Sequence, residues 1–123
     1  MATILVVDDE FGVAEVIEAI LEDDGHTVVC AVNGRQGLQR MAERTPDLIL
    51  LDFMMPLMDG PTMLRAIKAD PIMSGVPVVM MSSLDEATVR AECAGYVAFL
   101  RKPFRATQIS KTVANALGDA VSA

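Results

Sequence analysis

Two short and intensely apolar runs in this chain each end in acidic residues. The run ILVVDD ends in Asp8 and Asp9, and the run LILLD ends in Asp52. A short run that is apolar at nearly every position is typical of a strand buried on both faces of a parallel sheet. Because parallel strands all end at the same edge, the three carboxylates should lie close together. The pattern predicts a parallel sheet with an acidic site at one edge.

The whole chain alternates short strand-like segments with longer helix-like segments five times. The pattern predicts strands at 3–7, 27–31, 48–51, 78–81 and 97–100. It predicts helices at 11–25, 33–45, 61–69, 85–94 and 104–117, each bounded by capping residues, Gly or Pro. This order implies right-handed crossovers, with helices on both faces of a parallel sheet. We therefore expect a single α/β domain spanning residues 1–123.

Apolar residues at helical spacing indicate which helix faces point into the core. The first helix ends at Gly25, a plausible C-cap, and its stripe consists of Val13, Val16, Ile17, Ile20 and Leu21. The second follows the N-cap Asn33 and should turn Leu38 and Met41 inward. The stripe of the fifth consists of Ile109, Val113, Ala116 and Leu117.

Charge and composition exclude several classes of function. A formal net charge of -7 argues against nonspecific binding to nucleic acid or anionic lipid. No uncharged apolar run approaches the roughly 18 residues of a membrane span, and the start MATILVV lacks the basic segment of a signal peptide. We expect a cytoplasmic protein. Cys30 and Cys93 are expected to be free core thiols rather than a disulfide or metal pair.

Four motifs carry a resemblance to a known family. In this order and spacing, VVDDE, LLDFMMPLMDG, VVMMSS and FLRKPF resemble the receiver domain of two-component response regulators. The resemblance runs from residue 3 to about 117. It implies a flavodoxin-like (βα)5 fold, a doubly wound parallel sheet of strand order 2-1-3-4-5. It also implies an aspartate that is phosphorylated by a histidine kinase.

The resemblance assigns the acidic residues to phosphoryl transfer. Asp52 matches the phosphoacceptor, and Mg²⁺ would be bound by Asp9, by Asp52, by the backbone carbonyl of Met54 and, through water, by Asp8. Phosphoryl transfer depends on positioning and charge neutralisation, and Mg²⁺ prefers oxygen ligands and keeps several waters. The alternative is that Asp8 and Asp9 only cap the first helix, a role that we expect for Glu10.

Three further residues match the signalling machinery of the family. Lys102 would contact the phosphoryl group and, in the free protein, pair with Asp52. The family has a cis peptide at the position of Lys102-Pro103. Ser82 would donate a hydrogen bond to the phosphoryl group, and Phe99 would turn inward in response. Phe99 could instead be an ordinary core side chain.

The predicted output surface, made by the fourth helix and the fifth strand and helix, departs from the family pattern. The segment 82–95 is about two residues shorter than usual, which predicts a fourth helix that is shortened, tilted or irregular. The following residues are unusually apolar, and the candidate output residues are Tyr96, Val97 and Arg101. For Tyr96, exposure to a partner and inward packing remain equal alternatives. Bulky Met54 and Leu84 beside the site predict slow loss of the phosphoryl group, since neither side chain can position a water.

Other function classes fit less well. A haloacid dehalogenase type phosphatase needs a second aspartate where Met54 stands. A flavodoxin-like FMN carrier needs a glycine- and hydroxyl-rich loop where this chain has DDEFG. A degenerate receiver that acts only as a constitutive binding module would not need the complete set of Asp8, Asp9, Asp52, Ser82 and Lys102.

We therefore expect a stand-alone response regulator that catalyses only its own phosphorylation and dephosphorylation. Its partners would be a sensor histidine kinase or histidine phosphotransfer protein and a downstream protein target, with no nucleic acid and no membrane. We expect a monomer that could dimerise when phosphorylated. Met1 and the short tail after Gly118 fit a complete small gene. The alternatives are a phosphate sink for a shared kinase and a receiver from a larger hybrid kinase.

Overall fold

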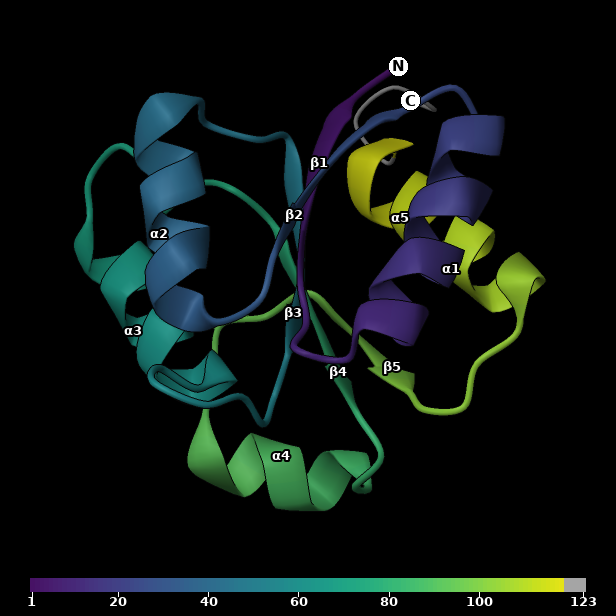
Figure 1. Cartoon of the computed structure of the whole chain (residues 1–123). Coiled ribbons are helices and arrows are strands. Elements are labelled where there is room, and N and C mark those ends of the chain that lie inside the picture. The colour runs from purple at the N-terminus through teal and green to yellow at the C-terminus, as the bar shows by residue number, and fades with distance from the viewer. Residues whose placement is uncertain (119–123) are drawn as a thin grey trace.

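A computed structural model describes residues 1–118, so residues 119–123 of the predicted domain lie outside the described part. The elements follow one another as β1 (Thr3–Val7), α1 (Phe11–Asp23), β2 (Thr27–Ala31), α2 (Gly34–Glu43), β3 (Leu48–Asp52), α3 (Gly60–Ala69), β4 (Val78–Ser82), α4 (Glu86–Glu92), β5 (Ala98–Arg101) and α5 (Ala106–Gly118). The strands form one parallel sheet in the order β2-β1-β3-β4-β5 (Figure 1). The predicted fold class and strand order are confirmed.

The helices cover both faces of the sheet (Figure 1). Successive residues of a strand point to opposite faces, and β1 shows the alternation clearly. Leu5 and Val7 pack in the core cluster that also contains residues of α2, α3 and α4. Ile4 and Val6 pack in a second cluster with α1 and α5. The strands β1, β3 and β4 are therefore buried on both faces, as the sequence predicted, whereas the edge strands β2 and β5 are only partly buried.

The predicted inward face of α1 is partly wrong. Val16 is 57% exposed, whereas Ala14, Ile17 and Leu21 are the buried residues of the helix. These three residues have the spacing i, i+3 and i+7 and so lie on one face. Ala14 is small, so the helix face that contains it looks less apolar in the sequence than the adjacent face that contains the larger Val16. The sequence pattern therefore assigned Val16 to the core instead of Ala14.

The other predicted boundaries hold within a few residues. Asn33 caps α2 by accepting a hydrogen bond from the backbone N–H of Gln36. Helix α5 begins at Ala106, two residues later than predicted, and β5 lies one residue further along. Among residues 1–118, none of the helices combines the length and the apolar character needed to cross a membrane.

Helix α4 is short, as the length of its segment predicted. It has 7 residues and buries only Val89. Asp85 caps its start by accepting a hydrogen bond from the N–H of Thr88 at 2.9 Å. After the helix, Gly95 adopts a φ of 97°, a left-handed conformation that is unfavourable for residues with a Cβ. Gly95 thus allows a tight turn in the short connection between α4 and β5.

Candidate functional site

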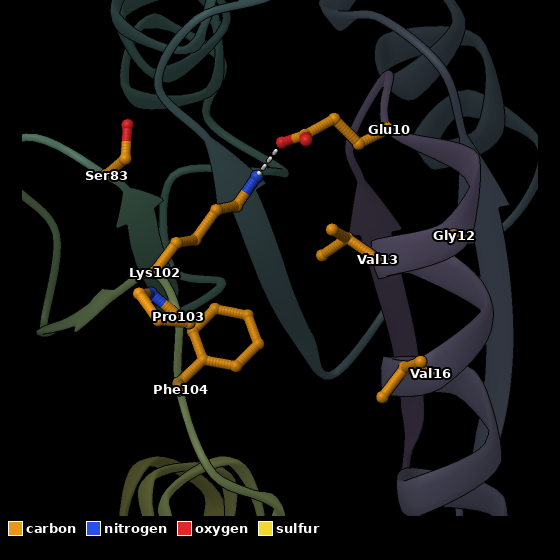
Figure 2. Close-up of a pocket in the computed structure, with 8 residues that line it drawn as sticks. All are labelled: Glu10, Gly12, Val13, Val16, Ser83, Lys102, Pro103 and Phe104. Atoms are coloured by element: carbon orange, nitrogen blue, oxygen red, sulfur yellow. Dashed lines mark hydrogen bonds and ion pairs between the residues drawn. The ribbon is translucent and has the colours of Figure 1, made fainter.

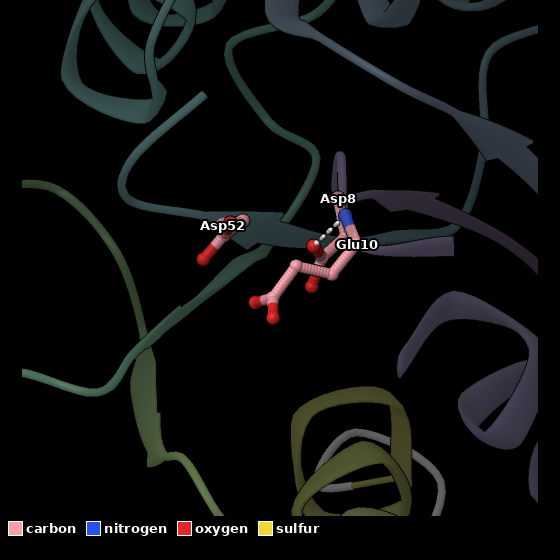
Figure 3. Close-up of side chains that lie close together, drawn as sticks. All are labelled: Asp8, Glu10 and Asp52. Carbon is pink, nitrogen blue, oxygen red and sulfur yellow. Dashed lines mark hydrogen bonds between the residues drawn. The ribbon is translucent and has the colours of Figure 1, made fainter. Parts of the chain in front are cut away.

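The candidate site lies where β1 and β3 end side by side. Asp8 follows β1 and is 1% exposed, and Asp52 ends β3 and is 5% exposed. After β1 the chain continues into α1 on one face of the sheet, and after β3 it continues into α3 on the other face. The two connections therefore separate and leave a crevice at the strand ends. Figure 3 shows Asp8 and Asp52 close together, with Glu10 beside them. The predicted gathering of acids at one sheet edge is present for Asp8 and Asp52.

Lys102 brings a positive charge to these acids from the end of β5. Its backbone N–H donates to the carbonyl of Ser82 at 2.8 Å, which extends the β4–β5 ladder by one residue. Its Nζ lies 2.9 Å from Asp8 Oδ2 and 3.3 Å from Asp52 Oδ1. The predicted pair with Asp52 is therefore present, but it is longer than the contact with Asp8. The peptide between Lys102 and Pro103 is cis.

Glu10 makes the shortest contact with Lys102, and its predicted role as a helix cap holds for its position but not for its side chain. Glu10 occupies the N-cap position of α1, but its side chain makes no capping hydrogen bond. Its Oε1 lies 2.7 Å from Lys102 Nζ, and Figure 2 shows the two side chains meeting between the start of α1 and the end of β5. The motif DDE shows that Glu10 is part of an acidic group, but its contact with Lys102, 92 residues away, has no local sequence pattern.

The site carries more negative than positive charge. Burial, followed by the negative charge of Asp8, raises the pKa of Asp52 to about 7, although Lys102 acts in the opposite direction. Burial disfavours the charged form of Lys102, but hydrogen bonds to Glu10 and Asp8 outweigh it and raise the pKa of the ammonium. Lys102 thus stays charged at neutral pH, while Asp52 is balanced between its two protonation states. A further cation would favour the ionised carboxylate.

Three carboxylates have the spacing of a metal site. One oxygen each from Asp8, Glu10 and Asp52 lie within 4.8 Å of one another. Among residues 1–118, Asp8 Oδ2 is buried and has no well-oriented hydrogen bond, although it lies close enough to Lys102 for an ion pair. Hard oxygen donors and an excess of negative charge fit a divalent cation such as Mg²⁺. The residues present therefore fit the predicted metal.

Asp9 and Met54, two of the predicted metal ligands, lie on another side of the site. Asp9 is exposed, and with Met54 and Leu84 it lines a groove of about 690 Å³ between the β3–α3 loop and α4. The Asp9 carboxylate is not part of the group formed by Asp8, Glu10 and Asp52. Its direct contact with the metal stays a prediction, as does that of the Met54 carbonyl.

The β3–α3 loop is held tightly against the phosphoacceptor candidate. The N–H of Gly60 donates to the carbonyl of Phe53 at 3.0 Å, and the Gly60 Cα faces the carbonyl oxygen of Asp52. A Cβ at Gly60 would clash with this oxygen and approach the Phe53 Cα to 2.9 Å. Asp59 caps α3 by accepting from the N–H of Thr62. Close backbone packing therefore fixes the position of Asp52.

The two predicted switch residues lie on neighbouring strands. Ser82 ends β4 with 3% exposure, and its Oγ accepts a hydrogen bond from the N–H of Leu84 at 3.0 Å. Phe99 lies in β5, where it pairs with Met80 of β4. It is partly buried and packs against the core cluster that α4 covers. Ser82 thus lies at the same sheet edge as Asp52, and the aromatic ring lies on the side of the sheet that α4 covers.

Of the two alternatives for Tyr96, the structure shows inward packing. The ring contacts the core cluster, and the hydroxyl donates to Glu86 Oε2 at 3.2 Å. Val97 is 58% exposed, and Arg101 is exposed with its Nε donating to the carbonyl of Ser83. Val97 and Arg101 therefore remain available on the predicted output surface, whereas Tyr96 fixes the end of the α4–β5 connection to the start of α4.

Comparison with known proteins gives one consistent result. Residues 4–114 match the response regulator receiver domain family. The DNA-binding response regulator MtrA of Mycolicibacterium paratuberculosis is 35% identical over 108 residues, which cover 86% of this chain and 47% of MtrA. This chain thus spans about half the length of MtrA.

Two solved structures have the same fold over nearly the whole chain. The receiver domain of a signal transduction histidine kinase from Syntrophus aciditrophicus superposes with a TM-score of 0.89 at 31% identity, covering 97% of this chain and 92% of that chain. The chemotaxis protein CheY4 of Vibrio cholerae superposes with a TM-score of 0.87 at 28% identity, covering 95% of this chain and 99% of that chain.

Proposed function

Because this chain belongs to the response regulator receiver domain family, we propose that Asp52 accepts a phosphoryl group from a phosphohistidine of a partner protein. The observation that carries the proposal is the position of Asp52, which ends a central strand within 3.3 Å of the Lys102 ammonium. An oxygen of Asp52 forms a bond to phosphorus as the bond from phosphorus to the histidine nitrogen breaks. The histidine recovers a proton from solvent.

Phosphoryl transfer asks the protein mainly for positioning and charge neutralisation. The strand end and the Gly60 contact fix the attacking carboxylate, and Lys102 offsets the negative charge of the incoming group. We propose Mg²⁺ as the cofactor, with Asp8, Asp9, Asp52 and the Met54 carbonyl as the residues that would hold it. When bound, the cation supplies the rest of the charge neutralisation.

The phosphoryl group would then act as a signal rather than as an intermediate. The hydroxyl of Ser82 would donate to a phosphoryl oxygen, and the ring of Phe99 would turn inward in response. These movements would change the surface made by α4, β5 and α5, where Val97 and Arg101 are exposed. A downstream protein would recognise the changed surface, and the chain would catalyse only its own phosphorylation and dephosphorylation.

The domain could act as a separate protein or as part of a longer one. We propose a stand-alone regulator, because CheY4 is matched over nearly all of its length. We also propose that it is a monomer that could dimerise when phosphorylated. A receiver within a longer protein is the second candidate, since MtrA continues well beyond the match and another relative is part of a histidine kinase. In either form the phosphodonor is a histidine kinase or a histidine phosphotransfer protein. A phosphate sink for a shared kinase would differ only in having no downstream protein target.

The proposal can be tested by incubating the protein with Mg²⁺ and a small phosphodonor and measuring the intact mass. We expect a gain of one phosphoryl group in the wild type and none in Asp52→Asn. The control Asp23→Asn removes an exposed acid at the end of α1 and should retain the adduct. An adduct that persists in Asp52→Asn, or that forms equally without a divalent cation, would contradict the proposal.

A further inference from the structure

Three carboxylates surround the Lys102 ammonium, and among the described residues only Glu10 accepts a well-oriented hydrogen bond from it. A lysine ammonium has three N–H donors. Among the described residues, Nζ lies within 3.3 Å of three carboxylates, which belong to Asp8, Glu10 and Asp52. Under the proposed function, on which this inference rests, a phosphoryl oxygen on Asp52 must also contact Nζ. The Lys102 side chain is only 12% exposed, so such an oxygen has to replace one of the contacts that already surround Nζ.

The three carboxylates differ in how easily they can move. The Asp8 side chain is fully buried, and its Oδ1 accepts a hydrogen bond from the N–H of Glu10 at 2.8 Å. Asp52 is nearly buried and would itself carry the phosphoryl group. The Glu10 side chain is 59% exposed, and Lys102 is its only hydrogen-bond partner among the described residues. Glu10 can therefore exchange its contact for water at the lowest cost.

We propose that Glu10 is a competing ligand of Lys102, which occupies the donor that the phosphoryl group needs and is released to solvent when Asp52 is phosphorylated. The competition is effective because the Glu10 contact, at 2.7 Å, is the shortest that Lys102 makes. Glu10 opposes the modified state in two ways. The ion pair has to break, and the freed carboxylate then lies near a group of the same charge.

The surroundings of Glu10 provide room for this release. Glu10 and Lys102 border an open depression of about 600 Å³ whose opposite walls are formed by Val13 on α1 and by Phe104 before α5 (Figure 2). The carboxylate can turn into this space without displacing core side chains. Glu10 is thus a residue that sets the affinity of the site for a phosphoryl group, and it does so through Lys102.

The test is the affinity for beryllofluoride, an analogue of the phosphoryl group, measured at saturating Mg²⁺ by calorimetry and by amide NMR spectra. Glu10→Gln removes the charge and keeps the size of the side chain, and we expect it to bind beryllofluoride about three- to fivefold more tightly than the wild type. The control Glu15→Gln removes an exposed charge from the same helix and should bind as the wild type does. In a Lys102→Met background, Glu10→Gln should give a smaller gain.

Each outcome separates this inference from the function on which it rests. If Glu10→Gln binds beryllofluoride no more tightly than the wild type, or if Glu15→Gln gives the same gain, the competition by Glu10 is refuted while the proposed function stands. Weaker binding of Mg²⁺ alone to Glu10→Gln would make Glu10 a metal ligand and would also refute it. If the wild type does not bind beryllofluoride, or Asp52→Asn binds it equally well, the proposed function fails and this inference fails with it.

Discussion

The Oγ of Ser82 accepts a hydrogen bond from the backbone N–H of Leu84 at 3.0 Å. A hydroxyl can accept one hydrogen bond and donate another at the same time, so this bond leaves the O–H of Ser82 able to reach a phosphoryl oxygen. The hydroxyl would then connect the modified aspartate directly to the first residues of the β4–α4 loop. Ser82 is therefore placed to couple the site to helix α4.

Replacement of Ser82 should separate binding from signalling. In Ser82→Ala we expect beryllofluoride to bind at Asp52 about ten- to a hundredfold more weakly, because one hydrogen bond to a charged group, worth about 1.5–3 kcal/mol, is lost. Amide shifts at Tyr96 and Phe99 should be reduced even at saturation, and Ser82→Thr should restore them. Full-size shifts in saturated Ser82→Ala would show that the hydroxyl does not transmit the change.

The raised pKa of Asp52 predicts that folding stability decreases as pH rises toward 7. The carboxyl has a pKa of about 7 in the folded protein and 3.8 as its ordinary value, so the folded state binds the proton more tightly between these limits. Stability is greatest while Asp52 is protonated and is lost as pH rises through the folded pKa. Asp52→Asn should therefore stabilise the metal-free protein by on the order of 2 kcal/mol at pH 8 and by much less at pH 4.

Urea denaturation at both pH values measures this difference, and added Mg²⁺ supplies the control. The cation should stabilise the wild type at pH 8 but have little effect on Asp52→Asn, because binding to the folded state alone increases stability. A gain from Asp52→Asn that is equal at pH 4 and pH 8 would contradict the assignment of the raised pKa to this residue.

The contact between Gly60 and the Asp52 carbonyl predicts opposite effects for two alanine substitutions. Gly60→Ala should destabilise the protein by about 1–3 kcal/mol and weaken beryllofluoride binding, because the new methyl group pushes against the backbone of Asp52. Gly12→Ala, in helix α1, meets no atom within 4 Å and should stabilise by about 0.5–1 kcal/mol. Thermal or urea denaturation measures both. Similar effects from the two substitutions would refute the steric argument.

The hydrogen bond between Tyr96 and Glu86 predicts that Tyr96 restrains helix α4. Tyr96→Phe keeps the packed ring but removes the bond, and it should cost about 0.5–1.5 kcal/mol and speed amide exchange in α4. Arg90→Gln removes the exposed ion pair with Glu86 and the contact of Arg90 with the Tyr96 hydroxyl, but it leaves the bond between Tyr96 and Glu86 and should have a smaller effect. Equal exchange in both variants would mean that the hydroxyl adds nothing to the restraint.

The groove beside Asp52 predicts a long-lived phosphoryl group. Met54 is 65% exposed and Leu84 is 36% exposed on its walls, and neither side chain can orient a water molecule. Met54→Asn should speed loss of phosphate from the purified phosphorylated protein by on the order of tenfold, because an amide can hold the attacking water. Ile72→Asn introduces the same amide at an exposed apolar position outside the groove and should leave the rate of phosphate loss unchanged. An unchanged rate in Met54→Asn would refute the prediction.

Most of the fold could be predicted because its signals are local. The five apolar runs set the strands to within one residue, and the positions of acids at the ends of β1 and β3 followed from parallel pairing. The resemblance supplied the strand order that local patterns leave open. Asn33 was recognisable as a helix cap because such a bond joins residues three apart in sequence.

The predictions failed where distant segments decide the outcome. Ala14 is buried instead of Val16 because the helix turns toward the space that the sheet and α5 leave, not toward its most apolar residue. Glu10 was predicted to be a cap, but the ammonium of Lys102 is a stronger partner than the free N–H groups of a helix start. Neither outcome has a signal in the neighbouring sequence.

The alternation of strand side chains between two core clusters divides the interior of this small protein into separate compartments. Ile17 and Met63 lie in different compartments, with the single layer of backbone between them. A change of packing around Met63 can therefore reach α4 without loosening the side of α1 and α5. Asp52 ends a strand that belongs to both compartments, so one chemical event there can reshape one half of the molecule while the other half keeps it folded.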